Sequence, residues 1–219
     1  MRIVATSDTH EKHWGLKVPD GDVFIHAGDF TMIGEPAWVD AFNTWLGMLP
    51  HKHKIVIAGN HDRSFDIDPA NALAFGQERL PNAIYLLNCG TVIDGKTFWG
   101  SPYTPFFNSD FWKFHYDRAE GEQMWAQIPK KLDVLITHGP PLRVLDKTLE
   151  GQYAGCYDLA RTIRWLGVAN EQPRYHLFGH IHEGYGRDVV IPGGTIALNV
   201  SAVDRMYRLR KDPCVEFDV

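Results

Sequence analysis

The chain has 219 residues, enough to bury its own hydrophobic core, and we expect a single domain over residues 1–219. Hydrophobic residues make up 44% and charged residues 22%, which excludes intrinsic disorder, a coiled coil and a collagen-like chain. With 22 Lys and Arg against 27 Asp and Glu, the net charge is -5, which does not favour duplex nucleic acid as a partner. A small anionic ligand is still compatible, because a bound metal ion can supply positive charge locally.

The cysteines and the N-terminus indicate the compartment. Cys89, Cys156 and Cys214 lie far apart, which fits neither a disulfide framework nor a zinc ribbon. The chain enters a strand-like segment at Arg2 without a basic and then apolar leader, and no apolar run approaches the ~18 residues that cross a membrane. We therefore expect a reduced, cytoplasmic protein that is not inserted in a membrane.

Short β-branched runs alternate with helical patterns along the chain. In chain order we expect strands at 2–7 and 22–27, a helix between 36 and 50, strands at 54–58, 83–88 and 97–100, a helix at 117–128, a strand at 132–137, a helix at 156–167, and strands at 174–178 and 195–200. The runs 86–100 and 189–200 resemble antiparallel hairpins. Continuous apolar runs such as VFIHA predict strands buried on both faces, and the whole pattern predicts an α/β domain with a mixed sheet.

Five of these strands end in clusters of His, Asp or Asn, within the segments SDTH, HAGDF, AGNHD, THGPP and FGHIH. In open α/β sheets, ligands bind at the carboxyl ends of the strands. We therefore expect the five clusters to converge on one site.

Two residue pairs in these clusters have the i, i+2 spacing that directs both side chains of an extended segment to one side. Asp8 and His10 follow the first strand, and His180 and His182 flank Ile181. Taken alone, the first pair also fits a turn with an exposed histidine. The second pair is the stronger indication of a metal site.

Three single residues complete the set. Asp29 offers a carboxylate that can bridge two cations, Asn60 an amide oxygen and His138 an imidazole. Taken alone, each also fits a structural role: a turn or helix cap for Asp29, a turn for Asn60 and a hydrogen-bonded histidine for His138.

Together the two Asp, one Asn and four His form a mixed nitrogen and oxygen donor set. Such a set suits Mn, Fe, Co, Ni or Zn and contains too much imidazole for Mg or Ca. Seven ligands exceed what one ion with open positions can use, whereas two ions that share a carboxylate can use them all. We expect two divalent transition-metal ions, with manganese as the first choice. A two-metal site clamps the attacking and leaving oxygens of a phosphoryl displacement.

In their order, the blocks DTH, GD, GNHD, THG and GHIH resemble the calcineurin-like metallophosphoesterase superfamily over residues 1–200. The phrases AGDFT, IVIAGNHD, GSPYTPFFN, THGPPL and FGHIHEGYG resemble its metallophosphoesterase-domain-containing phosphodiesterases, which have vertebrate brain and bacterial members. The resemblance implies one metallophosphoesterase domain, a four-layer α-β-β-α sandwich with two mixed sheets. It also implies metal-dependent hydrolysis of phosphodiesters, including cyclic nucleotides.

The resemblance divides the seven candidate ligands into a first-metal set, a second-metal set and a bridging carboxylate. These are, respectively, Asp8, His10 and His182; Asn60, His138 and His180; and Asp29. The implied reaction is in-line attack on a small phosphodiester, with cyclic nucleotides as the first choice, by a hydroxide that bridges the two ions. The alternatives are a phosphomonoesterase or a nuclease on the same site. A metal-free interaction module is disfavoured because none of the ligands is lost.

His61 matches the family histidine that protonates the leaving oxygen or stabilises the transition state. Many superfamily phosphatases carry an Asp and then an Arg after the GD block, but Met32 and Ile33 stand there in this chain. We therefore expect His61 to lack a carboxylate partner and to act either as a general acid or as a hydrogen-bond donor to a phosphoryl oxygen. The missing Arg also argues against a protein Ser/Thr phosphatase.

Substrate contacts are sought in the residues close to the ligand blocks. Aromatic residues of the Pro-rich loop fit either nucleobase stacking or packing within the loop: Tyr103, Phe106 and Phe107. Arginines near ligand blocks fit either a phosphate contact or an exposed surface: Arg63, Arg143 and Arg187. From these we name four candidate substrate contacts: Arg63, Tyr103, Phe107 and Arg187.

Overall fold

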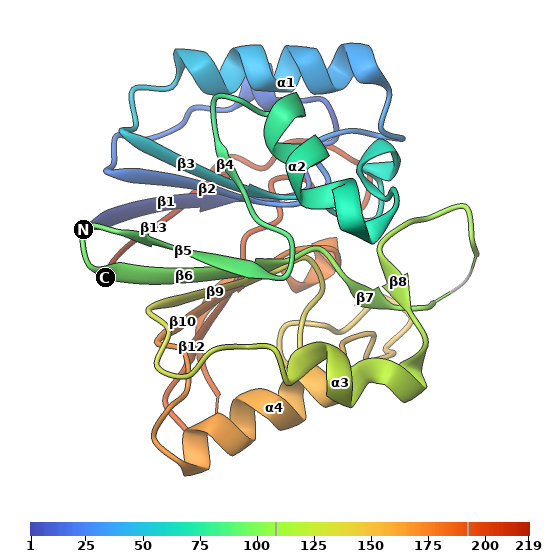
Figure 1. The fold of residues 1–219 in the computed structure, drawn as a ribbon, viewed down its shortest axis with the longest axis vertical. Helices are drawn as coiled ribbons and strands as arrows, with labels where there is room; N and C mark the ends of the chain where they lie inside the picture. The colour runs from blue at the N-terminus through green and yellow to red at the C-terminus, as the bar shows by residue number, and fades with distance from the viewer. Residues whose placement is uncertain (108, 192) are drawn as a thin grey trace.

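The computed structural model describes residues 1–107, 109–191 and 193–219, and the side chains of 187–190 lie outside the description. Its elements form four layers (Figure 1). Helices α1 (Pro36–Met48) and α2 (Pro69–Arg79) lie over a first sheet, a second sheet packs beneath it, and α3 (Gly121–Trp125) and α4 (Tyr157–Val168) cover the far side. This arrangement confirms the expected α-β-β-α sandwich with two mixed sheets.

The first sheet has five strands. In spatial order they are β13 (Val215–Asp218), β1 (Arg2–Thr6), β2 (Val23–Ala27), β3 (His53–Ile57) and β4 (Ile84–Tyr85). Strands β1 to β4 are parallel, whereas β13 pairs with β1 in the antiparallel direction. The two chain ends consequently lie side by side at one edge of the molecule (Figure 1).

The second sheet has six strands. In spatial order they are β11 (Gly186–Val190), β12 (Ile196–Asn199), β10 (Tyr175–Phe178), β9 (Val134–Thr137), β6 (Lys96–Ser101) and β5 (Cys89–Ile93). Its four inner strands are parallel and both edge strands are antiparallel, as the two predicted hairpins require. A separate parallel pair, β7 (Thr104–Pro105) and β8 (His115–Tyr116), lies in the loop after β6.

Three apolar cores hold the four layers together, because the side chains of each strand alternate between the two faces of its sheet. In β1, Ile3 and Ala5 face the second sheet, whereas Val4 faces the layer of α1. A third core joins the second sheet to α3 and α4. Strand β2 is buried along its whole length, which explains its continuous apolar sequence.

All eight predicted strands are present, and the predicted helices correspond to α1, α3 and α4. The helix expected at 117–128 is shorter, because a 3-10 turn at Arg118–Glu120 precedes α3. The sequence analysis missed α2, which buries only Ala72 and Gly76 and therefore lacks an apolar stripe. None of the helices in the described ranges is long and apolar enough to span a membrane.

His176 on β10 is a fully buried histidine between polar and apolar neighbours. Its Nε2 lies 2.8 Å from Thr137 Oγ1, and that hydroxyl donates to the carbonyl of Gly139 over 2.7 Å. The hydroxyl proton is therefore used, so Nε2 carries the proton of the first bond, while the buried Nδ1 has no partner among the described residues. Burial lowers the pKa of His176 to about 3, so the folded chain keeps this ring neutral.

We predict that acid destabilises the fold partly through this ring. Below about pH 6.5 the unfolded chain protonates His176 whereas the folded chain does not, so the free energy of unfolding should fall by ~1.4 kcal/mol per pH unit on its account. His176→Gln retains a donor at the Nε2 position but cannot titrate. Between pH 6.5 and 5, its free energy of unfolding, measured in urea, should therefore fall less steeply than that of the wild type, by about that slope. Parallel curves for the two proteins would contradict this explanation.

Candidate metal centre

All seven candidate ligands lie where strands of both sheets end. Asp8 and His10 follow β1, Asp29 follows β2 and Asn60 follows β3, all in the first sheet. The second sheet contributes the three others, which follow β9 and β10: His138, His180 and His182. The site therefore forms where the two sheets meet. At this edge, an isolated parallel β-bridge pairs the backbones of Ser7 and Ser201.

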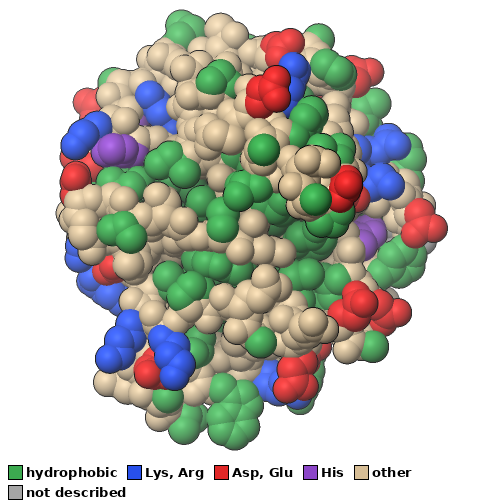
Figure 2. Space-filling view, viewed as in Figure 1, with side chains coloured by type: hydrophobic (Ala, Val, Ile, Leu, Met, Phe, Trp, Pro, Cys, Tyr) green, Lys and Arg blue, Asp and Glu red, His purple; other side chains and the backbone are tan. Residues whose placement is uncertain are grey.

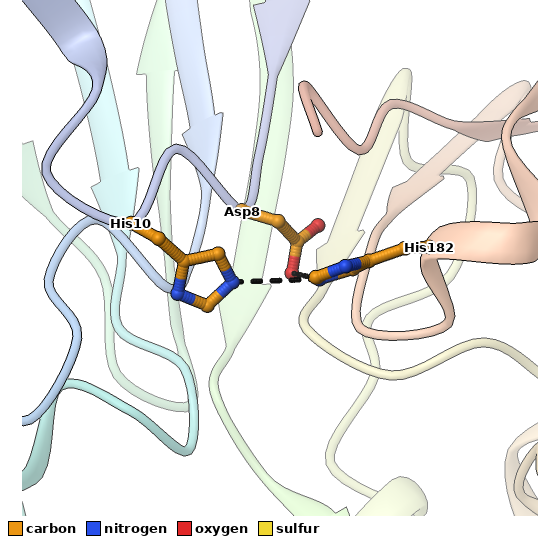
Figure 3. Close-up of side chains that lie close together, drawn as sticks. All are labelled: Asp8, His10 and His182. Carbon is orange, nitrogen blue, oxygen red and sulfur yellow. Dashed lines mark hydrogen bonds and ion pairs between the residues drawn. The ribbon is translucent and has the colours of Figure 1, made fainter. Parts of the chain in front are cut away.

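The first group of donor atoms comes from Asp8, His10 and His182 (Figure 3). The Nε2 atoms of the two histidines are 3.4 Å apart, and His182 Nε2 lies 3.5 Å from Asp8 Oδ1. All three ligand atoms lie within 4.8 Å of one another, so one cation could contact all of them. The second oxygen of Asp8 accepts hydrogen bonds from the hydroxyls of Ser7 and Ser201, which fixes the carboxylate.

The second group comes from Asp29, His138 and His180, whose ligand atoms meet the same 4.8 Å limit. His138 Nε2 lies 3.2 Å from Asp29 Oδ2 and 2.9 Å from Asn60 Oδ1, so the Asn60 amide oxygen belongs to this group. Asp29 Oδ2 also lies 3.9 Å from His10 Nε2 in the first group. The Asp29 carboxylate thus stands between the two groups, the position that a bridging ligand needs.

Backbone carbonyls orient three of the histidines in the same way. The Nδ1 atoms of His10, His138 and His182 lie 3.3, 3.1 and 3.3 Å from carbonyl oxygens of Thr31, Ala27 and Asp204. A carbonyl can only accept, so Nδ1 carries the proton and the neutral ring presents the Nε2 lone pair to the site. This is the tautomer that binds a metal through Nε2.

Burial and the carboxylates set the protonation of the cluster. Burial lowers the pKa of both His10 and His180 to about 3, so both rings are neutral. Burial would also lower the pKa of His138, but the Asp29 carboxylate outweighs it and raises that pKa to about 9. A proton on His138 therefore supplies positive charge beside Asp29 in the metal-free chain, and a bound cation would replace it.

The backbone is strained at the candidate ligands. Asp8, His10, Asp29 and His180 all adopt left-handed conformations, with φ of 52°, 41°, 56° and 65°. Such conformations cost ~1–3 kcal/mol each and persist where the surrounding structure determines them. The glycine at 179 is required for a different reason, because a Cβ there would clash with the Asp8 carboxylate.

His61 is oriented by a backbone carbonyl and forms a third group of ligand atoms with His10 and Asp29, within the same 4.8 Å limit. Its Nδ1 lies 2.7 Å from the carbonyl oxygen of Met32, and its ring packs against Trp112 with 4.1 Å between centroids. Its Nε2 lies 4.0 Å from Asp29 Oδ2. As expected from the sequence, position 32 offers His61 no carboxylate, but the Met32 carbonyl provides an acceptor that the sequence could not reveal.

The Asp62 carboxylate holds two ligand-bearing loops together. In the loop after β2 it accepts hydrogen bonds from three backbone N–H groups and from the Thr31 hydroxyl, and before Asn60 it accepts one more from a backbone N–H. The four N–H donors are those of Asp29, Phe30, Thr31 and Gly59. Burial and the nearby Asp29 charge raise the pKa of Asp62 to about 7, against the opposing effect of these donors. Asp62 thus positions the ligands without belonging to a donor group.

A cavity of about 220 Å³ opens beside the donor groups. The candidate ligands Asp29, Asn60, His180 and His182 line it together with the following other residues: His61, Phe107, Trp112, Glu183, Arg205 and Tyr207. The Arg205 guanidinium also pairs with Glu150 at 3.1 Å.

Of the four residues named as candidate substrate contacts, Phe107 lines this cavity. Arg63 instead stacks on Phe111, with its guanidinium carbon 3.9 Å from the ring centre, and Tyr103 packs against Phe114. The side chain of Arg187 lies outside the described residues.

The sequence analysis missed four lining residues: Trp112, Glu183, Arg205 and Tyr207. The signal that could have found two of them is the rule already applied to other strands. Arg205 and Tyr207 follow the end of β12, which is also a strand of the central sheets. Trp112 had no such signal, because it reaches the site from the long loop that contains β7 and β8.

Comparison with known proteins gives a consistent result. A family model described as calcineurin-like phosphoesterase matches residues 1–184. Metallophosphoesterase domain-containing protein 1 from Homo sapiens is 40% identical over 98% of this chain and 70% of its own length. UPF0046 protein K07C11.7 from Caenorhabditis elegans is 38% identical over 98% of this chain and 74% of its own. A solved structure from Thermus thermophilus has a TM-score of 0.60 at 16% identity, covering 95% of this chain and 96% of that one.

We predict that Asp62→Asn destabilises the fold by at least ~2 kcal/mol, because the new amide group would point N–H atoms at N–H donors that are buried. Asp66→Asn is the matched control, since within the described ranges the Asp66 side chain accepts one hydrogen bond, of 3.4 Å from the Phe114 N–H. Chemical unfolding of both variants in the metal-free state measures the difference. Equal stability of the two variants would show that the Asp62 contacts do not hold the loops.

Proposed function

The chain belongs to the calcineurin-like phosphoesterase family, and from that premise we propose that it hydrolyses small phosphodiesters with two bound divalent transition-metal ions. The first substrates to test are cyclic nucleotides. The observation that carries the proposal is the position of Asp29, whose carboxylate stands between two groups of donor atoms at the edge of a cavity. The three cysteines are free, which supports a reducing compartment, and we propose the cytoplasm.

The donor atoms fit two transition-metal ions. We propose that Asp8, His10 and His182 hold the first ion. Asn60, His138 and His180 would hold the second, with Asp29 shared between both. The carbonyl contacts of three Nδ1 atoms support this assignment, because they leave Nε2 lone pairs facing the site. Manganese is our first choice among Mn, Fe, Co, Ni and Zn, all of which suit such a mixed set.

Two cations at these residues would make a nucleophile available from water at neutral pH and would stabilise charge on the phosphoryl oxygens. The residues of the chain supply positioning and proton transfer. Met32 O fixes Nδ1–H of His61, so a second proton on this ring is at Nε2, on the side of Asp29. From there His61 can donate to the leaving oxygen or to a phosphoryl oxygen. The Trp112 ring restricts its rotation.

The charges on the cavity wall support a diester as substrate. The described lining contains one cation outside the donor groups, Arg205, and one carboxylate, Glu183. A phosphomonoester dianion would bring one more negative charge to Glu183 than a phosphodiester does, and Arg205 already pairs with Glu150. The cavity of about 220 Å³ also fits a small substrate rather than a polymer.

We predict that exhaustive chelation abolishes hydrolysis and that manganese restores it. The decisive measurement is a steady-state comparison of the manganese-loaded protein on five substrates: an aryl diester, an aryl monoester, 2′,3′-cyclic and 3′,5′-cyclic nucleotides, and single-stranded DNA. The diesters should have the highest kcat/KM. Full activity of protein shown by elemental analysis to be metal-free would overturn the metal mechanism, and a preference for the monoester or DNA would replace the diester assignment.

We predict that His61→Ala retains bound metal but lowers kcat, by ~100-fold, the lower end of the range for a positioned proton donor. The loss should be larger for a cyclic nucleotide than for a nitrophenyl diester, because a nitrophenolate leaves without a proton and an alkoxide does not. His53→Ala, at the opposite end of β3, is the control. Equal losses on both substrates would assign His61 to the phosphoryl oxygens instead. Loss of metal would assign it to the metal site.

A further inference from the structure

A second cavity, of about 240 Å³, adjoins the cavity beside the donor groups. The two cavities share Phe107 and His180 in their walls. We call the second one the side pocket. Its other walls include Thr104, Pro105, Ala154 and Ile181. The side pocket therefore begins at a proposed metal ligand and extends away from the donor groups between mostly apolar side chains.

The walls of the side pocket come from ordered elements. Thr104 and Pro105 form β7, and the Gly139–Pro140 segment follows β9 after His138. Phe107 stands at the boundary of the two cavities, with its ring centre 5.2 Å from that of His180. Charged side chains are absent from the described lining, so an apolar group, and not a phosphate, fits this space.

We propose that the side pocket binds a flat aromatic ring on the substituent that stays attached to phosphorus. This inference rests on the proposed function, since it places the phosphodiester at the donor groups. His61, which faces the leaving oxygen in that reaction, is not among the side-pocket residues and packs against Trp112 instead. The leaving group is therefore assigned to the His61 side and the retained group to the His180 side.

Filling the side pocket tests the inference. Ala154 is exposed and lines the pocket, so Ala154→Phe should fill it without disturbing the core, and Gln152→Phe in the same loop is the control outside the lining. Two substrates share the nitrophenolate leaving group and differ in the retained group: bis(p-nitrophenyl) phosphate and methyl p-nitrophenyl phosphate. Ala154→Phe should lower kcat/KM for the first by ~10-fold or more, and for the second by less than ~2-fold. Equal effects on both substrates, or none, would overturn the inference.

A binding measurement separates this inference from the proposed function. Titration calorimetry of the manganese-loaded protein with phenylphosphonate and with methylphosphonate needs no turnover. Ala154→Phe should weaken the phenyl compound selectively, even if the wild-type protein hydrolysed neither diester, a result that would count against the proposed function alone. Unchanged preference for the phenyl compound in Ala154→Phe would overturn the side pocket as its binding place.

Discussion

Five hydrogen bonds to the buried Asp62 carboxylate join the loop after β2 to the loop after β3. The first loop carries Asp29 and the second carries Asn60, so one side chain fixes the distance between two proposed metal ligands. In the same arrangement, the backbone N–H of His61 donates a 2.8 Å hydrogen bond to Asp29 Oδ1. Because an unpaired buried carboxylate is costly, this network has to form as a unit, and the remaining site geometry depends on it.

The rest of the site depends on contact between the two sheets. Asp8 from the first sheet accepts hydrogen bonds from Ser201 and from the His180 N–H of the second. His138 from the second sheet reaches back to the Ala27 carbonyl and Asp29 of the first. The core between the sheets thus brings together ligands that are far apart in sequence, and its stability offsets the strained backbone at four of them. Hydrophobic side chains also emerge across the middle of one face, with charges of both signs around them (Figure 2).

The strands and the ligand blocks were predictable from the sequence for physical reasons. Strands buried on both faces need continuous apolar runs, as in β2, and a polar cluster directly after such a run has to lie at the sheet edge. Helix α2 could not be predicted in the same way, because it packs through Ala72 and Gly76 and shows no apolar periodicity. Strand β13 was missed because it lies at a sheet edge and is only partly buried, so its sequence shows no continuous apolar run.

Parts of the candidate site depend on main-chain atoms and long loops, which leave no mark on the sequence. The acceptor for His61 is the carbonyl of Met32, a group that every residue type at this position would offer. Trp112 reaches the site from the irregular segment between β7 and β8 and packs against His61. Sequence patterns therefore locate the donor atoms, whereas the substrate-facing walls require the fold.

The central claim is that Asp29 joins two metal ions held by the edges of two sheets. Anomalous diffraction from crystals of the manganese-loaded protein tests it most directly. We expect two anomalous peaks, one beside Asp8, His10 and His182 and one beside Asn60, His138 and His180, with the Asp29 carboxylate within bonding distance of both. A single peak, or an Asp29 carboxylate that contacts only one of two ions, would contradict the claim.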